Sequence, residues 1–382
     1  MGSGDRRSGS VGGGPVDLPR WTTRGGGPRS RPRRRQHVPR GRCGLTGRLR
    51  ERDETGTQAV KKEPQMKSSL TLAIPTFNRS QDAARLAGQI APWTEAGDCP
   101  VSAVFYDDAS TDDTYTLLQQ YRSDNLKVIR NDTNQGYART LIRALSECDS
   151  DWVMLIADDD VFAPEPSQLQ DLLTWLHVED PDFVCTQWLR SDGGLYRGKN
   201  STEPITDRRL REASSHAPGL IYGSSSVRLA LPLLHRELAR GSDAALVYPQ
   251  VVLLAQMIAA GGKAMYWPGS LVREGSALPS GIRDIKGRRY SSAASRLSQA
   301  LAFDRLYLQM EREAPNRQYR RHCRTFRKDN EIRMAKALKR ILRAHVPRDM
   351  RPHEMFGAVA RSGLRLLRQN LRRHISRLVH MP

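Results

Sequence analysis

Residues 70–80 read LTLAIPTFNRS, and this stretch decides the fold of the chain. Residues 70–74 are a short apolar run that stops at Pro75, a pattern that predicts a buried β-strand ending there. Asn78 and Arg79 follow, and Ser80 is a good N-cap for a helix that we expect to run through Ile90. The stretch is therefore the strand, loop and helix start of a βα unit.

The same order of strand, polar loop and helix recurs further along the chain. Strands that alternate with helices favour a mostly parallel sheet with helices on both faces. The predicted fold class is therefore α/β, with a Rossmann-like sheet. We expect further strands at residues 101–106, 126–129, 152–157 and 182–186, a helix that starts in the polar cluster 107–114 and runs through Tyr121, and a helix at 137–147.

Three of the predicted strands end in polar clusters, at residues 75–79, 107–113 and 158–160. In open α/β sheets, ligands bind in the crevice beyond the carboxyl ends of the strands. Because the carboxyl ends of parallel strands share one edge, we expect the three clusters to converge in one crevice.

The cluster at residues 158–160 is a triplet of aspartates, Asp158, Asp159 and Asp160, directly after an apolar strand. Adjacent carboxylates repel one another, so something positive should compensate. Mg²⁺ or Mn²⁺ prefers carboxylate oxygens and often keeps phosphate oxygens as further ligands. Such an ion could neutralise a diphosphate leaving group. The alternative is a solvated acidic loop or helix cap.

The neighbouring clusters also have two interpretations. Asp107 and Asp108 can accept hydrogen bonds from a nucleotide base or a ribose hydroxyl, or Asp108, Ser110 or Asp112 can cap the next helix, and the two roles are compatible. Arg139 can hold a phosphate, or it can be a solvated residue on a helix face.

Four segments together carry a family resemblance: LTLAIPTFNRS at 70–80, VFYDDASTDDT at 104–114, NQGYARTLIRA at 134–144 and WVMLIADDDVFAP at 152–164. In this order and spacing they resemble family 2 glycosyltransferases, which are inverting enzymes with the A-type glycosyltransferase fold. The resemblance covers residues 68–190 well and 190–275 loosely. The triple aspartate is similar to members that build bacterial surface polysaccharides, including abequosyltransferase- and rhamnosyltransferase-like enzymes.

This resemblance implies a role for each matching residue. Asp107 and Asp108 would contact the base and ribose, and Asp158 would contact the ribose or the sugar. Asp159 and Asp160 would bind the metal, Mg²⁺ or Mn²⁺. The nucleotide-sugar site would also include Pro75, Thr76, Asn78, Arg79, Gly136 and Arg139.

The resemblance leaves the catalytic base open. An inverting transfer needs a group that takes the proton of the acceptor hydroxyl. Family members commonly supply it from a Glu-Asp pair upstream of a glycine, but the residues upstream of Gly261 include Gln250 and no acid at that place. Asp243 is the nearest acid, and its alternative role is a helix cap. His235 is the second candidate.

The charge of the chain is concentrated at its two ends. The 382 residues contain 61 Lys and Arg against 41 Asp and Glu, which gives a net charge of +20. Residues 1–65 carry +10, residues 317–382 carry +15, and the body between them carries −5. Residues 1–65 also hold 13 of the 30 glycines, so we expect a disordered basic tail. Met66 offers an alternative start, with the upstream residues an over-extended reading frame.

We therefore divide the chain into the tail (1–65), a catalytic domain (66–275) and a basic helical region (276–382). The catalytic domain has a nucleotide-sugar half (66–190) and an acceptor half (190–275). Residues 332–346 and 364–378 are expected to form helices with leucine and arginine faces. They would either lie on an anionic membrane surface or pack on the catalytic body.

Composition restricts the location of the protein. The first residues lack the apolar core of a signal peptide, and the most apolar stretch, residues 244–260, is short for a bilayer. The five scattered cysteines favour a reducing compartment. We expect a cytoplasmic protein, peripheral on the inner face of the plasma membrane if its basic helices bind lipid.

The partners expected from the sequence are a nucleotide-diphosphate sugar and a glycan or lipid-linked glycan acceptor. The aromatic candidates for stacking on sugar rings are Trp188, Tyr196, Tyr222 and Trp267, although such residues are more often core. Two alternative functions remain at this point. The basic tails are compatible with a nucleic-acid-binding protein, and the carboxylates are compatible with a nucleotidyltransferase of similar fold.

Overall fold

The computed structural model describes residues 69–95, 101–275 and 293–345, with side chains described as far as residue 337. The amino-terminal half of this part alternates strands and helices: β1 (Leu70–Thr76), α1 (Ser80–Glu95), β2 (Val101–Asp107), α2 (Thr114–Gln119), β3 (Leu126–Arg130), α3 (Tyr137–Glu147), β4 (Trp152–Leu155), β5 (Val161–Phe162), α4 (Pro166–Glu179) and β6 (Phe183–Leu189). The remainder contains β7 (Leu195–Arg197), β8 (Glu203–Pro204), η1 (Asp207–Arg209), α5 (Leu210–Ser214), β9 (Leu220–Gly223), α6 (Ser224–Ala239), α7 (Asp243–Val247), α8 (Pro249–Ala259), β10 (Ala264–Arg273), α9 (Ala293–Arg312) and α10 (Arg317–His345).

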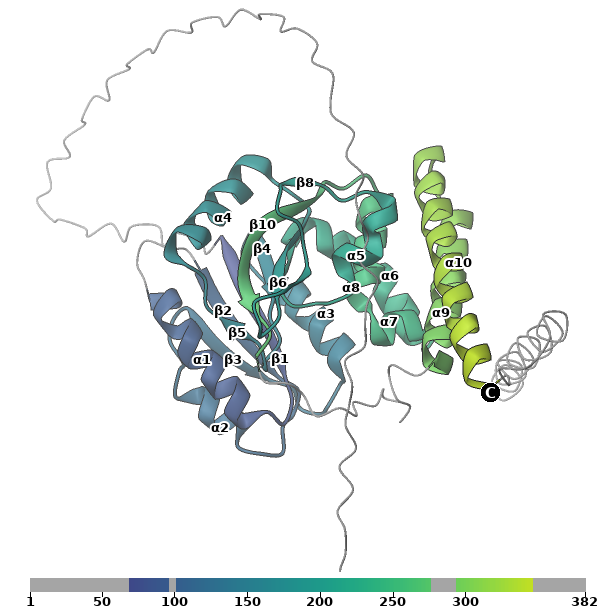
Figure 1. Ribbon diagram of the computed structural model, residues 1–382. Helices are drawn as coiled ribbons and strands as arrows, with labels where there is room; N and C mark the ends of the chain where they lie inside the picture. Colours follow the sequence, from purple (N-terminus) through teal and green to yellow (C-terminus); the bar gives the residue numbers. More distant parts are fainter. Residues whose placement is uncertain (1–68, 96–100, 276–292, 346–382) are drawn as a thin grey trace, which may run out of the picture. The chain divides into compact units, whose positions relative to one another are not determined.

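The strands form one mixed sheet in the order β3-β2-β1-β4-β9-β6-β10-β5, with β7 beside β6 and β8 beside β10 (Figure 1). β3, β2, β1 and β4 are parallel. β9 is antiparallel to both β4 and β6, so β4 and β6 run in the same direction, and β10 is parallel to β6. The carboxyl ends of β1, β2, β4, β6 and β10 therefore lie at one edge of the sheet.

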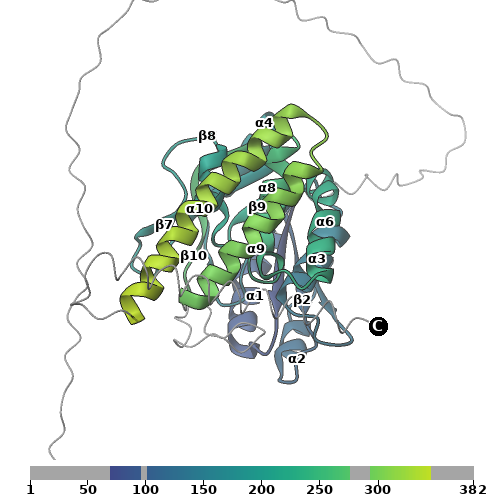
Figure 2. The same cartoon turned by 90° about the vertical axis from the view of Figure 1, so that its right-hand side faces the viewer.

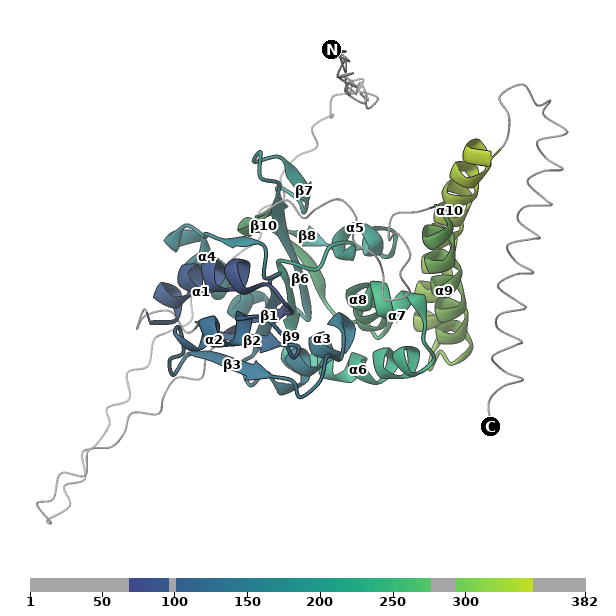
Figure 3. The same cartoon turned by 90° about the horizontal axis from the view of Figure 1, so that it is seen from below.

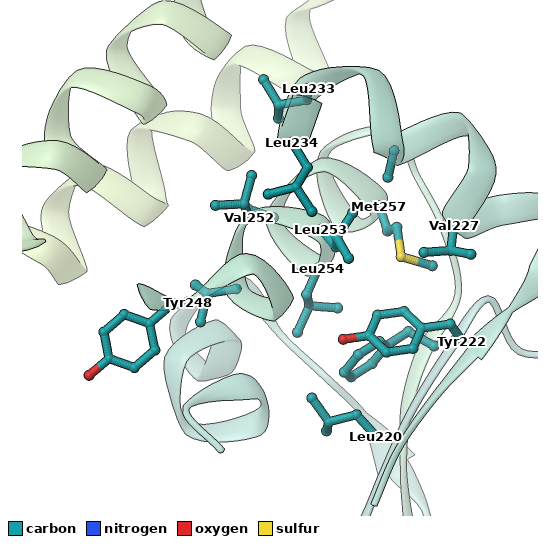
Figure 4. Close-up of a cluster of buried hydrophobic side chains, with 14 of the residues drawn as sticks. Leu220, Tyr222, Val227, Leu233, Leu234, Tyr248, Val252, Leu253, Leu254 and Met257 are labelled. Carbon is teal, nitrogen blue, oxygen red and sulfur yellow. The ribbon is translucent and has the colours of Figure 1, made fainter. Parts of the chain in front are cut away.

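Side chains alternate between the two faces of the sheet, and each face has its own core. Leu70, Leu72 and Ile74 of β1 pack with residues of α1 and α4, whereas Ala73 packs on the opposite face with α3, α6 and α8. Figure 3 shows the strands between these two groups of helices. In Figure 4, Leu254 of α8 lies next to Tyr222 and Leu220 of β9.

The core on the face of the sheet that α3, α6 and α8 cover is called the second core here. Helices α9 and α10 pack against each other and against helices of this second core (Figure 2). The guanidinium group of Arg211 on α5 lies 4.5 Å from the ring centre of Tyr248 and 4.4 Å from that of Phe303 on α9. Tyr319 and Phe326 of α10 are buried. Within residues 317–337 this region therefore packs on the helices that cover the sheet, while Ile332, at 56% exposed, faces away from them. The predicted helix at residues 364–378 lies outside the described residues.

Two features of the sheet differ from the sequence-based expectation. The first strand does not stop at Pro75 but continues through Thr76. The carbonyl oxygen of Thr76 accepts a hydrogen bond from Asp108 N, after β2, and the carbonyl oxygen of Ala73 accepts one from Ile156 N, after β4. Because successive residues of a strand direct their backbone groups to opposite sides, the nitrogen of Pro75 faces β4. Pairing with β4 ends at Ala73, and the missing N–H therefore costs no ladder bond. The second difference is that the expected strand list lacks five strands of the sheet, β5, β7, β8, β9 and β10. Of these, β9 lies antiparallel between β4 and β6.

The remaining expectations concern boundaries and cysteines. α3 spans the predicted residues 137–147, and the other predicted strands begin or end within a few residues of their observed bounds. Cys148, Cys185 and Cys323 are buried free thiols. The predicted tail, residues 1–65, lies outside the described residues. In the described ranges, no helix is both long enough and apolar enough to cross a membrane.

Candidate functional site

The loop after β1 is bonded to the loop after β2. The backbone N–H of Asn78 donates to Ser110 Oγ at 2.9 Å, and Asn78 Oδ1 accepts from the backbone N–H of Thr111 at 2.8 Å. Arg79 N donates to Thr114 Oγ1 at 3.0 Å. Asn78 has a φ of +52°, a conformation that Asn tolerates better than most residues. The two loops therefore form one rigid unit at the edge of the sheet.

Asp107 and Asp108 are buried at the end of β2, and both have protein partners. Asp107 Oδ1 accepts from the backbone N–H of Ser110, and its Oδ2 lies 3.3 Å from Arg130 Nε. Asp108 accepts three hydrogen bonds, from Asn131 Nδ2 at 2.7 Å and from the backbone N–H groups of Gln135 and Gly136 at 2.8 Å each. Asp108 thus holds the loop that leads into α3.

The aspartate triplet after β4 adjoins these loops. Asp158 Oδ2 accepts a hydrogen bond from Thr76 Oγ1 at 2.8 Å, and Asp159 Oδ2 lies 3.9 Å from Arg79 Nη1. Arg85 of α1 donates to the backbone carbonyls of Asp159 and Asp160, at 3.1 Å each. The polar clusters of three strand ends therefore meet at one place, as the strand directions require.

Gly275, two residues after the end of β10, passes close to the backbone of Asp159 and Asp160. A Cβ atom placed on Gly275 would lie 1.8 Å from the carbonyl oxygen of Asp159. That separation is far inside a van der Waals contact, so only glycine fits where the chain passes the triplet.

The three carboxylates of the triplet are short of positive charge. Burial raises the pKa of Asp158 to about 6, against the opposing effect of the Thr76 hydrogen bond. Burial also raises the pKa of Asp159. For Asp160, burial followed by the charge of Asp159 raises the pKa to about 7. Asp160 Oδ2 is buried and has no hydrogen-bond partner among the described residues. Such a group favours an additional cation.

A hard divalent ion fits the chemistry of this triplet in part. No set of three His, Cys, Asp or Glu side chains in the described ranges is arranged to hold a metal by itself. Mg²⁺, however, is commonly bound by one or two carboxylates, with substrate phosphates and water supplying the other ligands. Within the triplet, the observation that favours such a site is the buried oxygen of Asp160, which has no hydrogen-bond partner among the described residues.

Two other residues predicted for the nucleotide site lie at the start of α3. Gly136 has a φ of +80° and gives its N–H to Asp108, so its conformation sets the entry into the helix. Arg139 is exposed one turn further along. Pro75 and Thr76, by contrast, are in the last two positions of β1.

The two candidate bases lie on helices of the second core. Asp243 is the first residue of α7, is 7% exposed, and accepts a hydrogen bond from Ser298 Oγ of α9 at 2.5 Å. His235 is exposed on α6. Among the described residues, no hydrogen bond or ion pair joins either side chain to the three strand-end clusters.

Of the four aromatic candidates, three are buried and one is exposed. Tyr222 is fully buried, Trp267 is 7% exposed and Trp188 is 5% exposed. Tyr196, at 51% exposed, packs against Trp188 and against His216, which the sequence-based reasoning did not select. Arg85 was also missed. A single arginine one turn after a helix start carries no signal in sequence alone.

A surface pocket of about 290 Å³ lies at the opposite edge of the sheet, beside the starts of β6 and β10. Its one acidic residue, Asp182, accepts hydrogen bonds from Ser226 Oγ and the backbone N–H of Lys263. The carboxylate of Asp182 therefore joins the start of β6 to α6 and β10. The candidate functional residues lie at the other edge of the sheet, at the carboxyl ends of the strands.

Comparison with known proteins identifies the domain. Residues 71–230 match the family model described as glycosyl transferase family 2, so the chain carries a domain of this family. The chain is 29% identical over 96 residues to an uncharacterized glycosyltransferase of Haemophilus influenzae, across 25% of this chain and 31% of that protein. It is 26% identical over 153 residues to the abequosyltransferase RfbV of Salmonella typhimurium, across 35% and 45%. The chain thus spans less than half the length of either relative.

Solved structures agree on the fold. TarS of S. aureus, residues 1–349, has a TM-score of 0.51 with 15% identity, over 71% of this chain and 72% of TarS. The same protein in complex with UDP-GlcNAc has a TM-score of 0.52 with 16% identity, over 74% and 82%. The sheet and its flanking helices form the A-type glycosyltransferase fold expected from the sequence, and the carboxyl-terminal helices α9 and α10 are present as the expected extension.

Proposed function

We propose that this protein is a metal-dependent, inverting glycosyltransferase that moves a sugar from a nucleotide-diphosphate sugar to a glycan in bacterial surface polysaccharide synthesis. The observation that carries the proposal is the meeting of three polar strand ends around the aspartate triplet, in which Asp160 Oδ2 is buried without a hydrogen-bond partner among the described residues. The family 2 domain over residues 71–230 and the similarity to an abequosyltransferase support it.

In this proposal the donor lies across the joined loops after β1, β2 and β4. Pro75, Thr76, Asn78 and Arg79 form one wall, and Arg79 is close enough to the triplet to act on both a phosphate and Asp159. Asp107 and Asp108 shape the base and ribose end, with Gly136 and Arg139 beside them. Because the oxygens of Asp108 already accept three bonds, we expect it to act mainly by holding its loop.

Asp159 and Asp160 would hold Mg²⁺ or Mn²⁺, and Asp158 would contact the ribose or the sugar. When bound, the ion supplies positive charge to the diphosphate leaving group. The protein's own contribution is to hold the carboxylate of Asp158 through Thr76, to hold the backbone of Asp159 and Asp160 through Arg85, and to keep Asp160 buried. A low-dielectric surrounding strengthens the interaction of these charges with a bound cation.

The reaction requires the acceptor hydroxyl to attack the anomeric carbon while the bond to the diphosphate breaks, with inversion at that carbon. A base takes the hydroxyl proton during attack. Asp243 is our candidate, because it is a buried carboxylate held by Ser298, and His235 is the second. Asp243→Asn should lower kcat by at least about 100-fold with donor binding intact. His235→Gln, at an exposed position, serves as the matched comparison.

The proposal is tested first by thermal unfolding of the full chain with UDP, TDP, GDP and CDP, each with and without Mn²⁺. A ligand at about 100 times its Kd adds about 2.7 kcal/mol of stability. We expect one nucleotide to raise Tm in a Mn²⁺-dependent way and Asp159→Asn to abolish the shift. Asp132→Asn, at an exposed position after β3, should behave as wild type. No shift with any nucleotide, together with salt-dependent RNA or DNA binding, would overturn the proposal.

We further propose that the outer face of α10 rests on an anionic membrane, where a lipid-linked glycan acceptor would be found. Arg317, Arg321 and Lys328 recur along the side opposite the buried Tyr319 and Phe326. Arg321 and Lys328 make no ion pair within the described residues. A cluster of cations near an anionic leaflet contributes about 1 kcal/mol for each residue.

Co-sedimentation with vesicles tests this surface. The double variant Arg321→Gln, Lys328→Gln should bind phosphatidylglycerol vesicles at least tenfold more weakly than wild type. The control, Arg122→Gln with Lys127→Gln, removes the same charge from exposed positions near β3 and should leave binding unchanged. Equal losses in both variants would mean that net charge, rather than α10, attracts the membrane.

A further inference from the structure

An aromatic cluster of Trp188, Tyr196 and His216 lies at the carboxyl end of β6. The ring centres of Trp188 and His216 are 4.2 Å apart, and Tyr196 lies 5.3 Å from Trp188 and 5.6 Å from His216. All three contacts are edge-to-face. Because β6 runs in the same direction as β4, the cluster lies at the edge of the sheet where the aspartate triplet begins.

The strand register places the cluster near the triplet. Trp188 pairs with Val272 of β10, and Val272 pairs on its other side with Phe162, two residues after Asp160. Both Trp188 Nε1 and Asp160 Oδ2 are buried without a close hydrogen-bond partner in the described part of the chain, and so is His216 Nε2. The aromatic cluster and the aspartates therefore form two sides of one site.

A buried arginine fixes the position of the cluster. Arg197, only 3% exposed, donates to the carbonyl oxygens of His216 at 2.5 Å and Pro218 at 2.7 Å, with a longer bond to Thr186 at 3.3 Å. The turn before β7 is also held, because Ser191 N donates to Glu274 Oε2 at 3.0 Å. Tyr196 is thus an exposed ring on a rigid support.

The exposed ring has a cationic neighbour. The guanidinium carbon of Arg190 lies over the ring of Tyr196, 5.5 Å from its centre, in a cation–π contact. Within the described residues Arg190 has no ion pair, and its side chain forms no hydrogen bond. An aromatic face beside hydrogen-bond donors suits a sugar ring, whose C–H face is apolar and whose rim carries hydroxyls. An acyl chain would leave the guanidinium unused.

We propose that Tyr196, supported by Trp188 and His216, is the stacking surface for a pyranose ring of the acceptor glycan, with Arg190 bonding its hydroxyls. The assignment of this ring to the acceptor rests on the proposed glycosyltransferase function. The donor occupies the loops after β1, β2 and β4, and the aromatic cluster lies across the triplet from them, on the acceptor side of the reaction.

The test uses the full chain and methyl α-pyranosides of galactose, mannose and rhamnose as probes. Saturation-transfer NMR should show contact with the C–H protons of at least one probe. Tyr196→Ala should weaken that binding by about three- to tenfold, while Tyr196→Phe retains it, because the stacking contribution is about 0.5–1.5 kcal/mol. Leu195→Ala, at the adjacent exposed apolar residue, should bind as wild type.

A second measurement separates this inference from the proposed function. Binding of the nucleoside diphosphate with Mn²⁺ should be the same in wild type and Tyr196→Ala, and with an active acceptor the variant should raise KM and leave kcat nearly unchanged. If no nucleotide binds but the pyranoside contact depends on Tyr196, the donor proposal fails and the sugar surface stands. Absence of pyranoside binding to wild type, or equal loss in Leu195→Ala, would overturn the sugar surface.

Discussion

Asp108 and Asp160 each follow a strand at the same edge of the sheet, and each is 4% exposed. Asp108 accepts three hydrogen bonds from the loop that enters α3. Asp160 has one oxygen without a partner among the described residues, and its pKa is raised to about 7. The two carboxylates are therefore equally buried, but only that of Asp108 has hydrogen-bond partners for both oxygens. The loop after β2 uses its carboxylate to build the fold, whereas the loop after β4 keeps a carboxylate available for a ligand.

The largest effect should come from removing the satisfied carboxylate. Asp108→Ala removes the acceptor of the backbone N–H of Gln135, and it removes the shorter of two acceptors from the buried amide of Asn131 and from the backbone N–H of Gly136. Because a buried donor left unpaired costs about 1–3 kcal/mol, we expect the free energy of unfolding, from urea titration, to fall by about 3 kcal/mol. Asp132→Ala, at an exposed carboxylate on the same loop, should change it by less than about 0.5 kcal/mol. If Asp108→Ala lowered the free energy of unfolding by less than about 1 kcal/mol, the proposed structural role of the Asp108 carboxylate would be wrong.

Removing the unsatisfied carboxylate should have the opposite sign. The folded-state pKa of Asp160 lies above the value of about 3.9 expected in the unfolded chain. Between these values the folded state binds more protons, so its stability falls as pH rises through that window. Asp160→Asn should therefore raise the free energy of unfolding by about 2 kcal/mol at pH 8 and change it little at pH 4. A pH-independent effect would point to packing instead of charge.

A third substitution asks whether a buried, unpartnered oxygen marks a ligand site wherever it occurs. The hydroxyl of Tyr222 is fully buried in the second core and lacks a hydrogen-bond partner in the described ranges. Tyr222→Phe removes that oxygen without changing the ring, so we expect a gain of up to about 1 kcal/mol and unchanged nucleotide and sugar binding. Reduced binding would show that unsatisfied groups in this core also affect the site.

The smallest effect on stability should come from Arg79. Its side chain is about one-third exposed and lies 3.9 Å from Asp159, so the ion pair should contribute less than about 1 kcal/mol. Arg79→Gln should leave the free energy of unfolding nearly unchanged but weaken nucleotide binding, measured by calorimetry, by at least about tenfold. The comparison variant is Arg122→Gln, at an exposed position outside the strand-end loops.

The sequence predicts the first half of the fold and the residue types of the site well, because these depend on local pattern. The strand, loop and helix order from Leu70 to Glu147 repeats in a way that periodicity detects. β9 escapes prediction because its four residues give no strong period, and its place between β4 and β6 depends on contacts far apart in the chain.

The partners within the site are equally hard to predict. Thr76 bonds Asp158 across 82 positions, and Arg85 reaches the carbonyls of the triplet from α1. Three consecutive aspartates look alike in sequence, yet each has a different neighbour, Thr76, Arg79 or Trp188. The neighbour of each aspartate depends on the register of β1 against β4 and on the position of β6 in the sheet, and neither can be read from the local sequence.

The position of β9 also dictates the order in which the sheet can be completed during synthesis. A ribosome that has made 190 residues has delivered β1 to β6, but the seam between β4 and β6 stays open until residues 220–223 emerge. The open edges of β4 and β6 then expose unpaired backbone groups on the nascent chain. We expect chains arrested before residue 220 to need chaperones, and the sheet to become protease-resistant only once β9 has joined its two halves.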